Sequence, residues 1–160
     1  MSSRSKTKSP SKTVYIGKIY ADWCGHCRTL VSEWDSMKRM VKLNMGRTLK
    51  NMNIKFVEIG ETEQSRALGK DLDQMLAEFN KTHLSKSDDN VALHGGYPTI
   101  FKVCNERVEY YEGERNADNI YNWATGKCSQ KSLRKNKKGK TKHKRKAGKK
   151  NATRRTYTWF

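Results

Sequence analysis

A chain of 160 residues is long enough to form one domain with its own apolar core. Its net charge of +18 comes from its ends: residues 1–12 and 129–160 contain eighteen Lys and Arg and no acid, whereas residues 13–128 contain sixteen of each sign. The sequence shows neither the apolar core of a secretory signal nor the run of about 18 apolar residues that crosses a membrane. We therefore expect a basic arm over 1–12, a charge-balanced domain over 13–127 and a basic tail over 128–160.

Apolar residues with periods of two and 3.6 predict four strands and three helices in the central domain. The expected elements, in chain order, are a strand at 13–21, a helix at about 24–43, a strand at 54–59, a helix carrying Leu68, Leu72, Met75, Leu76 and Phe79, a loop at 82–94, strands at 97–103 and 107–111, and a helix from Asn116 through Trp123. A strand–helix–strand start gives a parallel pair, and two closely spaced strands give a hairpin. The order thus predicts an α/β fold with a mixed central sheet flanked by helices.

Two cysteines, Cys24 and Cys27, stand where the first strand gives way to a helix. A C-x-x-C pair in this setting indicates a redox site. The unpaired N–H groups and the dipole at a helix N-terminus favour an anion, so we expect Cys24 to attack as a thiolate and Cys27 to resolve. Gly25 is expected to let the turn form without a side chain in the way of a partner. His26 is expected to stabilise the Cys24 thiolate, which makes the disulfide more oxidising.

Three segments, in order, resemble the protein disulfide isomerase branch of the thioredoxin superfamily: YADWCGHC at 20–27, GYPTI at 96–100 and YEGER at 111–115. The resemblance implies a thioredoxin fold over about residues 13–127, with Cys24 and Cys27 forming the redox disulfide. It implies a cis proline at Pro98 that faces this disulfide and shapes, with its neighbours Tyr97 and Thr99, the groove where a substrate docks. It also implies that Trp23 lies on the surface beside the cysteines.

One position departs from that family. The family usually has a buried carboxylate six residues before the first cysteine, and this chain has Lys18 there. In the isomerase branch a lysine on the next strand pairs with the carboxylate, and the alignment of that strand places Glu58 at the lysine position. Because a lone buried lysine would be costly, we expect a Lys18–Glu58 pair with exchanged charges beneath the disulfide. Proton transfer to and from Cys27 would then fall to Glu58 or Lys18.

A zinc half-site is the alternative for the C-x-x-C pair. A structural zinc ion needs four ligands, and Cys104 and Cys128 do not supply a second C-x-x-C. We therefore expect no metal and no other cofactor. Cys104 is expected to be a small buried residue at a strand end and Cys128 a free thiol, with a disulfide between the two left open.

The predicted function is that of a thiol–disulfide oxidoreductase acting on protein thiols and disulfides together with an unidentified redox partner. His26 would bias it toward oxidase or isomerase activity. The alternative is a redox-capable scaffold or binding module whose basic tail contacts nucleic acid or another polyanion without sequence specificity. Without a secretion signal or a membrane segment, we expect an intracellular monomer in the cytoplasm, the nucleus or a virion. Cytoplasmic disulfide formation in a large DNA virus is one setting that fits.

Overall fold

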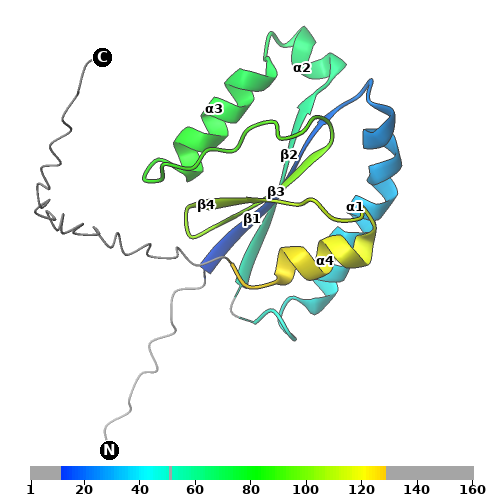
Figure 1. Ribbon diagram of the computed structural model, residues 1–160, viewed down its shortest axis with the longest axis vertical. Helices are drawn as coiled ribbons and strands as arrows, with labels where there is room; N and C mark the ends of the chain where they lie inside the picture. The colour runs from blue at the N-terminus through cyan, green and yellow to red at the C-terminus, as the bar shows by residue number, and fades with distance from the viewer. Residues whose placement is uncertain (1–11, 51, 129–160) are drawn as a thin grey trace, which may run out of the picture. The chain divides into compact units, whose positions relative to one another are not determined.

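The computed structural model describes residues 12–50 and 52–128 (Figure 1). The predicted basic arm and basic tail fall outside these residues. The elements in chain order are β1 (Lys12–Ala21), α1 (Gly25–Asn44), β2 (Met52–Glu61), α2 (Glu63–Ala67), α3 (Leu72–His83), β3 (Thr99–Cys104), β4 (Arg107–Tyr110) and α4 (Ala117–Thr125). Among these helices, none has both the length and the apolar character required to cross a bilayer.

The four strands form one sheet in the order β2-β1-β3-β4. β1 runs parallel to β2 and antiparallel to β3, and β3 runs antiparallel to β4, so the predicted mixed sheet is confirmed. In this register Lys18 lies opposite Glu58 on one side and Ile100 on the other. The C-terminal ends of β1 and β2 and the N-terminal end of β3 therefore meet at one edge, where α1 and α2 begin.

Each face of the sheet has its own apolar core. α1 and α4 cover one face, and α3 lies on the other side (Figure 1). The first core gathers helix residues at three- and four-residue spacing against the sheet: Leu30, Trp34, Met37, Val41, Ile120 and Ala124. The second core places Leu76 and Phe79 of α3 over Phe101 and Val103. Burial on both faces fixes the position of β1, and hence of the residues that follow it.

The helix expected to carry Leu68 through Phe79 is two helices, so this prediction was wrong. α2 ends at Ala67, and Leu68 is 67% exposed. Gly69 follows with a φ of +65°, a left-handed conformation that a helix cannot contain. Asp71 then starts α3 by accepting a 2.7 Å hydrogen bond from the N–H of Gln74.

The expectation that Cys128 is a free thiol was also wrong. Cys104 and Cys128 form a disulfide, with their Cα atoms 6.0 Å apart and a separation of 24 positions in sequence. Cys104 ends β3 and is buried, as predicted, in the core beneath α1 and α4. Cys128 packs against the same core, because α4 brings the chain back across that face of the sheet.

Candidate active site

Cys24 stands at the N-terminal end of α1, one turn before Cys27. Its backbone is extended, with φ −81° and ψ 117°, and its sulfur caps the helix by accepting a 3.2 Å hydrogen bond from the N–H of Cys27. A thiolate at this point meets the N–H groups that a helix start leaves unpaired. Both cysteines are buried thiols, so the structure shows the predicted redox pair Cys24–Cys27 in its reduced form.

The surroundings of the two thiols move their pKa values in opposite directions. Burial opposes ionisation of Cys24, but hydrogen bonds from the Cys27 thiol and N–H and from the His26 N–H, with the charge of Arg115, hold its pKa below the ordinary value. Burial is also the largest influence on Cys27, and together with its hydrogen bond to Cys24 it raises the pKa of that thiol to about 11. Cys24 is therefore the more easily ionised thiol of the pair, and Cys27 the less easily ionised one.

The loop before β3 faces Cys24. The Tyr97–Pro98 peptide bond is cis, as the resemblance implied, and the carbonyl oxygen of Tyr97 accepts a 3.8 Å hydrogen bond from the Cys24 thiol. Trp23 is 59% exposed and meets the Tyr97 ring edge-on, with the ring centroids 5.5 Å apart. Thr99 is buried, and its hydroxyl oxygen lies 2.9 and 2.8 Å from the carbonyl oxygens of His94 and Gly96. Thr99 thus holds the loop in place beneath the groove.

The predicted ion pair between Lys18 and Glu58 is confirmed. Lys18 Nζ lies 3.2 Å from Glu58 Oε2, and the lysine side chain is 9% exposed whereas the carboxylate is 34% exposed. The other carboxylate oxygen accepts 2.9 Å hydrogen bonds from Lys38 Nζ and Trp34 Nε1. Burial opposes the charge on Glu58, but these two bonds and Lys18 hold the pKa of the carboxyl below its usual value. Sequence reasoning missed Lys38, because its helical position alone does not reveal a partner on β2.

A hollow of about 400 Å³ connects this ion pair to the redox pair. Its lining includes Cys27, Lys18, Glu58 and Asp35. The two charged groups therefore reach the same space as the less acidic thiol. A proton leaving Cys27 has charged groups on this side and the Cys24 sulfur on the other.

Comparison with known proteins agrees with this geometry. The family model for thioredoxin matches residues 4–75. A protein disulfide-isomerase A6 homolog of Drosophila melanogaster is 27% identical over 122 residues, which cover 73% of this chain and 21% of that protein. The chain is therefore similar to thioredoxin over residues 4–75 and to a protein disulfide isomerase over 73% of its length.

Two further proteins match a smaller part of this chain, or match it at lower identity, than the Drosophila melanogaster homolog does. Protein disulfide-isomerase 1 of Caenorhabditis elegans is 32% identical over 53 residues, 33% of this chain and 11% of that protein. The first thioredoxin domain of mouse protein disulfide-isomerase A4 is 19% identical, with a TM-score of 0.42, and the match covers 69% of this chain and 60% of that one. The chain thus spans about a fifth or less of the length of the curated relatives it matches.

Two residues inside the motif of this thioredoxin domain act differently from the sequence expectation. Gly25 is the first residue of α1, and a Cβ placed there would meet Arg28 only at 4.0 Å, so the turn does not require a glycine. The absence of a side chain next to Cys24 is the part of the expectation for Gly25 that remains. The His26 side chain is exposed, and the residue lowers the pKa of Cys24 through its backbone N–H.

Arg115 is a site residue to which the sequence assigned no role. It follows the hairpin, and its Nη2 donates a 3.1 Å hydrogen bond to the carbonyl oxygen of Pro98. Its positive charge lowers the pKa of both Cys24 and Cys27. The YEGER segment was the available signal, since it ends on this arginine. Within residues 12–50 and 52–128, no three His, Cys, Asp or Glu side chains gather as ligands for a metal ion.

Proposed function

We propose that this domain is a thiol–disulfide oxidoreductase that exchanges disulfides with protein substrates. The observation that carries the proposal is the opposite displacement of the two thiol pKa values, below the ordinary value for Cys24 and to about 11 for Cys27. Nucleophile and resolving group are thereby distinguished before any substrate arrives. The exposed Trp23 and the loop of cis Pro98 supply a surface for an extended substrate segment beside Cys24.

The exchange takes place in two displacements. The Cys24 thiolate attacks one sulfur of a substrate disulfide, forms a mixed disulfide and releases the other substrate sulfur as a thiolate. Cys27 then loses its proton and attacks the Cys24 sulfur, which forms the Cys24–Cys27 disulfide and releases the second substrate thiolate. Two electrons pass to the substrate. In the reverse direction the domain's disulfide is reduced and a substrate dithiol is oxidised.

The same geometry supports a bias toward oxidase or isomerase activity. Hydrogen bonds and the charge of Arg115 stabilise the Cys24 thiolate, and a stabilised reduced form makes the disulfide a stronger oxidant. A reduction potential near −180 mV, typical of protein disulfide isomerase, is expected rather than about −270 mV, typical of thioredoxin. Equilibration of the Cys24–Cys27 pair with glutathione buffers measures it, and a value near −270 mV would overturn the bias.

The experiment that tests the proposed activity compares three proteins on one scrambled protein substrate. The wild-type chain should catalyse both disulfide reduction and refolding, and Cys24→Ser should reduce both to the uncatalysed rate. Cys128→Ser is the matched control, because it removes a cysteine that lies in the other pair. Equal rates for wild type and Cys24→Ser would refute the proposed activity.

We further propose that the Lys18–Glu58 pair handles the proton of Cys27. A thiol with a pKa of about 11 must lose its proton to resolve the mixed disulfide near neutral pH, and the hollow beneath it contains both charged groups. Glu58→Gln should slow resolution and move its pH profile upward, while the attack by Cys24 stays unchanged. Asp89→Asn, an exposed carboxylate paired with Arg107, is the control. A resolution profile that is identical in Glu58→Gln and wild type would refute this role.

The basic ends favour a second function, contact with a polyanion. Residues 129–160 contain fourteen Lys and Arg and no acid, a composition that binds nucleic acid through its phosphates. Removing these residues should lower the salt concentration that elutes the protein from heparin and leave disulfide exchange unchanged. Unchanged elution would refute the polyanion function.

A further inference from the structure

Two aromatic residues from distant parts of the chain flank Cys24, where the sequence resemblance implies a substrate groove. Trp23 directly precedes Cys24, and Tyr97 directly precedes cis Pro98. Their rings meet edge-on at 5.5 Å, and the Tyr97 carbonyl oxygen lies 3.8 Å from the Cys24 sulfur, a contact between residues 73 apart in sequence. The position of the Tyr97 ring therefore decides the shape of the surface that an incoming substrate meets.

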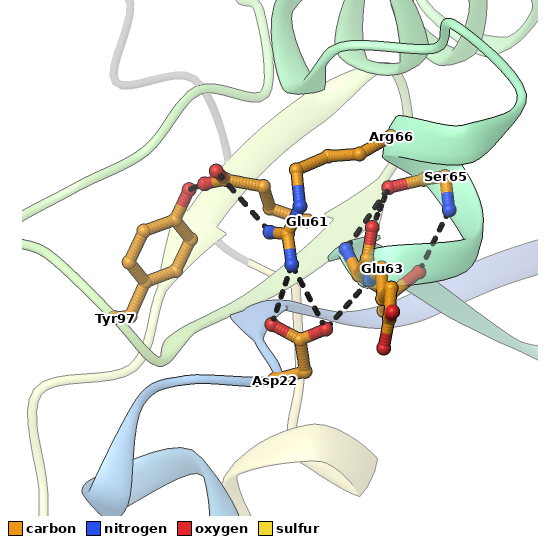
Figure 2. A network of polar contacts seen from close by, with 7 residues as sticks. Asp22, Glu61, Glu63, Ser65, Arg66 and Tyr97 are labelled. Carbon is orange, nitrogen blue, oxygen red and sulfur yellow. Dashed lines mark hydrogen bonds and ion pairs between the residues drawn. The ribbon is translucent and has the colours of Figure 1, made fainter.

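A series of polar contacts begins at the hydroxyl of the Tyr97 ring (Figure 2). The Tyr97 hydroxyl donates a 2.9 Å hydrogen bond to Glu61 Oε2, at the end of β2. The other oxygen of Glu61 lies 3.7 Å from Arg66 Nη1 on α2, and Arg66 Nη2 lies 3.3 Å from Asp22 Oδ2. Asp22 also accepts a 2.6 Å hydrogen bond from the N–H of Glu63. The contacts thus link the loop of Pro98, through β2 and α2, to the loop of Cys24.

Apolar packing does little to hold α2, whereas the Tyr97 ring also packs against the second core and against Ala21 and the two cysteines. α2 has five residues, of which Ser65 is the buried one, and Leu68 after it is 67% exposed. The side chains of Arg66, Asp22 and Glu61 are 46%, 37% and 33% exposed. Exposed ion pairs of this kind add little to the stability of a fold, because water screens them. What they can fix is the relative position of the two loops that flank Cys24.

We propose that Tyr97, Glu61, Arg66 and Asp22 form a positioning brace that holds the aromatic rim of the groove and thereby sets how tightly a peptide disulfide is captured by Cys24. The inference rests on the proposed exchange activity. Burial and the bond to Glu61 raise the pKa of Tyr97 to about 12, so its hydroxyl remains a donor throughout the working range of the thiols. Arg66 is not among the groups that shift the pKa of Cys24, so its role is separable from activation of the nucleophile.

The test compares two variants. Tyr97→Phe deletes one hydroxyl, and Arg66→Met removes the ion pairs with Asp22 and Glu61. Arg107→Met is the matched control, an arginine that pairs with Asp89 beside the opposite end of β3. The reduced full-length protein reacts in single turnovers with a ten-residue peptide containing one disulfide, and separately with hydroxyethyl disulfide, which has no flanking residues. The reaction rate is followed against disulfide concentration.

Each brace variant should raise the half-saturating peptide concentration about fivefold, as expected for one lost hydrogen bond, with the limiting rate unchanged. In Arg66→Met, the rate with hydroxyethyl disulfide and the pH profile of Cys24 alkylation should stay as in wild type. The double variant should show no more loss than the larger single one, since both break the same chain of contacts. Peptide saturation that is unchanged, or an equal loss on both disulfides, would overturn the brace.

A second measurement distinguishes failure of the brace from failure of the proposed exchange activity. If wild-type Cys24 reacts with neither disulfide, the proposed activity fails and the brace is judged by NMR. The indole N–H signal of Trp23 should then shift or broaden in Tyr97→Phe and Arg66→Met and stay sharp in Arg107→Met. An identical Trp23 signal in all four proteins would overturn the brace.

Discussion

The two cysteine pairs of this domain have the same atoms and opposite surroundings. Cys24 and Cys27 meet the free N–H groups of a helix start, next to a groove and to the charge of Arg115. Cys104 and Cys128 join a strand end to the segment after α4, and both pack against the apolar core. The first pair is held as thiols and the second as a disulfide. The difference teaches that donors around a sulfur, rather than cysteine spacing alone, make a pair reactive.

Trapping of substrates should separate the two pairs most strongly. Cys27→Ser removes the resolving thiol, so the mixed disulfide on Cys24 should persist and accumulate on a non-reducing gel. Cys128→Ser leaves the redox pair intact and should accumulate none above wild type. Comparable trapping by both variants would show that the pairs do not differ in reactivity.

Alkylation against pH should separate the two sulfurs within the redox pair. The depressed pKa of Cys24 predicts that its reaction with iodoacetamide reaches half of its limiting rate below pH 9.0, the ordinary value, and slows only as the pH falls through the depressed pKa. At pH 8, Cys27 with a pKa of about 11 should be about one-thousandth thiolate. Mass spectrometry of the labelled peptides checks this order, and faster labelling of Cys27 would reverse the proposed roles.

Stability should depend on the other pair. A disulfide that closes a loop of 24 residues restricts the unfolded chain, so Cys128→Ser should lower the free energy of unfolding by about 3 kcal/mol. Urea unfolding measures the loss, and a reducing agent should bring wild type to the level of the variant. Cys24→Ser is the control and should respond to the reducing agent as wild type does. A loss in Cys24→Ser as large as that in Cys128→Ser would remove the distinction between the pairs.

The smallest expected effect concerns His26. Its backbone N–H stabilises the Cys24 thiolate and its side chain is exposed, so His26→Ala, which keeps the N–H, should leave the pKa of Cys24 below the ordinary value. The alkylation profile measures the change. A return of that pKa to the ordinary value would place the stabilisation in the imidazole and restore the sequence-based interpretation of His26.

Local patterns were enough to predict the sheet and the strand–helix position of Cys24, and the family resemblance added the pairing of Lys18 with Glu58. Strand alternation and helical spacing are short-range properties, and parallel register places Lys18 opposite Glu58 once both strands are known. The break between α2 and α3 was also local, since Gly69 and Asp71 are visible in sequence, but the apolar spacing of Leu68 with Leu72 concealed it.

By itself, the sequence determined the redox motif and the mixed sheet, because both depend on residue type at short spacing, and its resemblance to a known family implied the thioredoxin fold and the exchanged charges beneath the motif. Only the tertiary structure decided the Cys104–Cys128 disulfide, the bond from Arg115 to Pro98 and the chain from Tyr97 to Asp22. Each of these joins residues from separate elements. Their meeting depends on how the helices pack on the sheet, since a side chain's partner is set by distances in space that residue spacing does not encode.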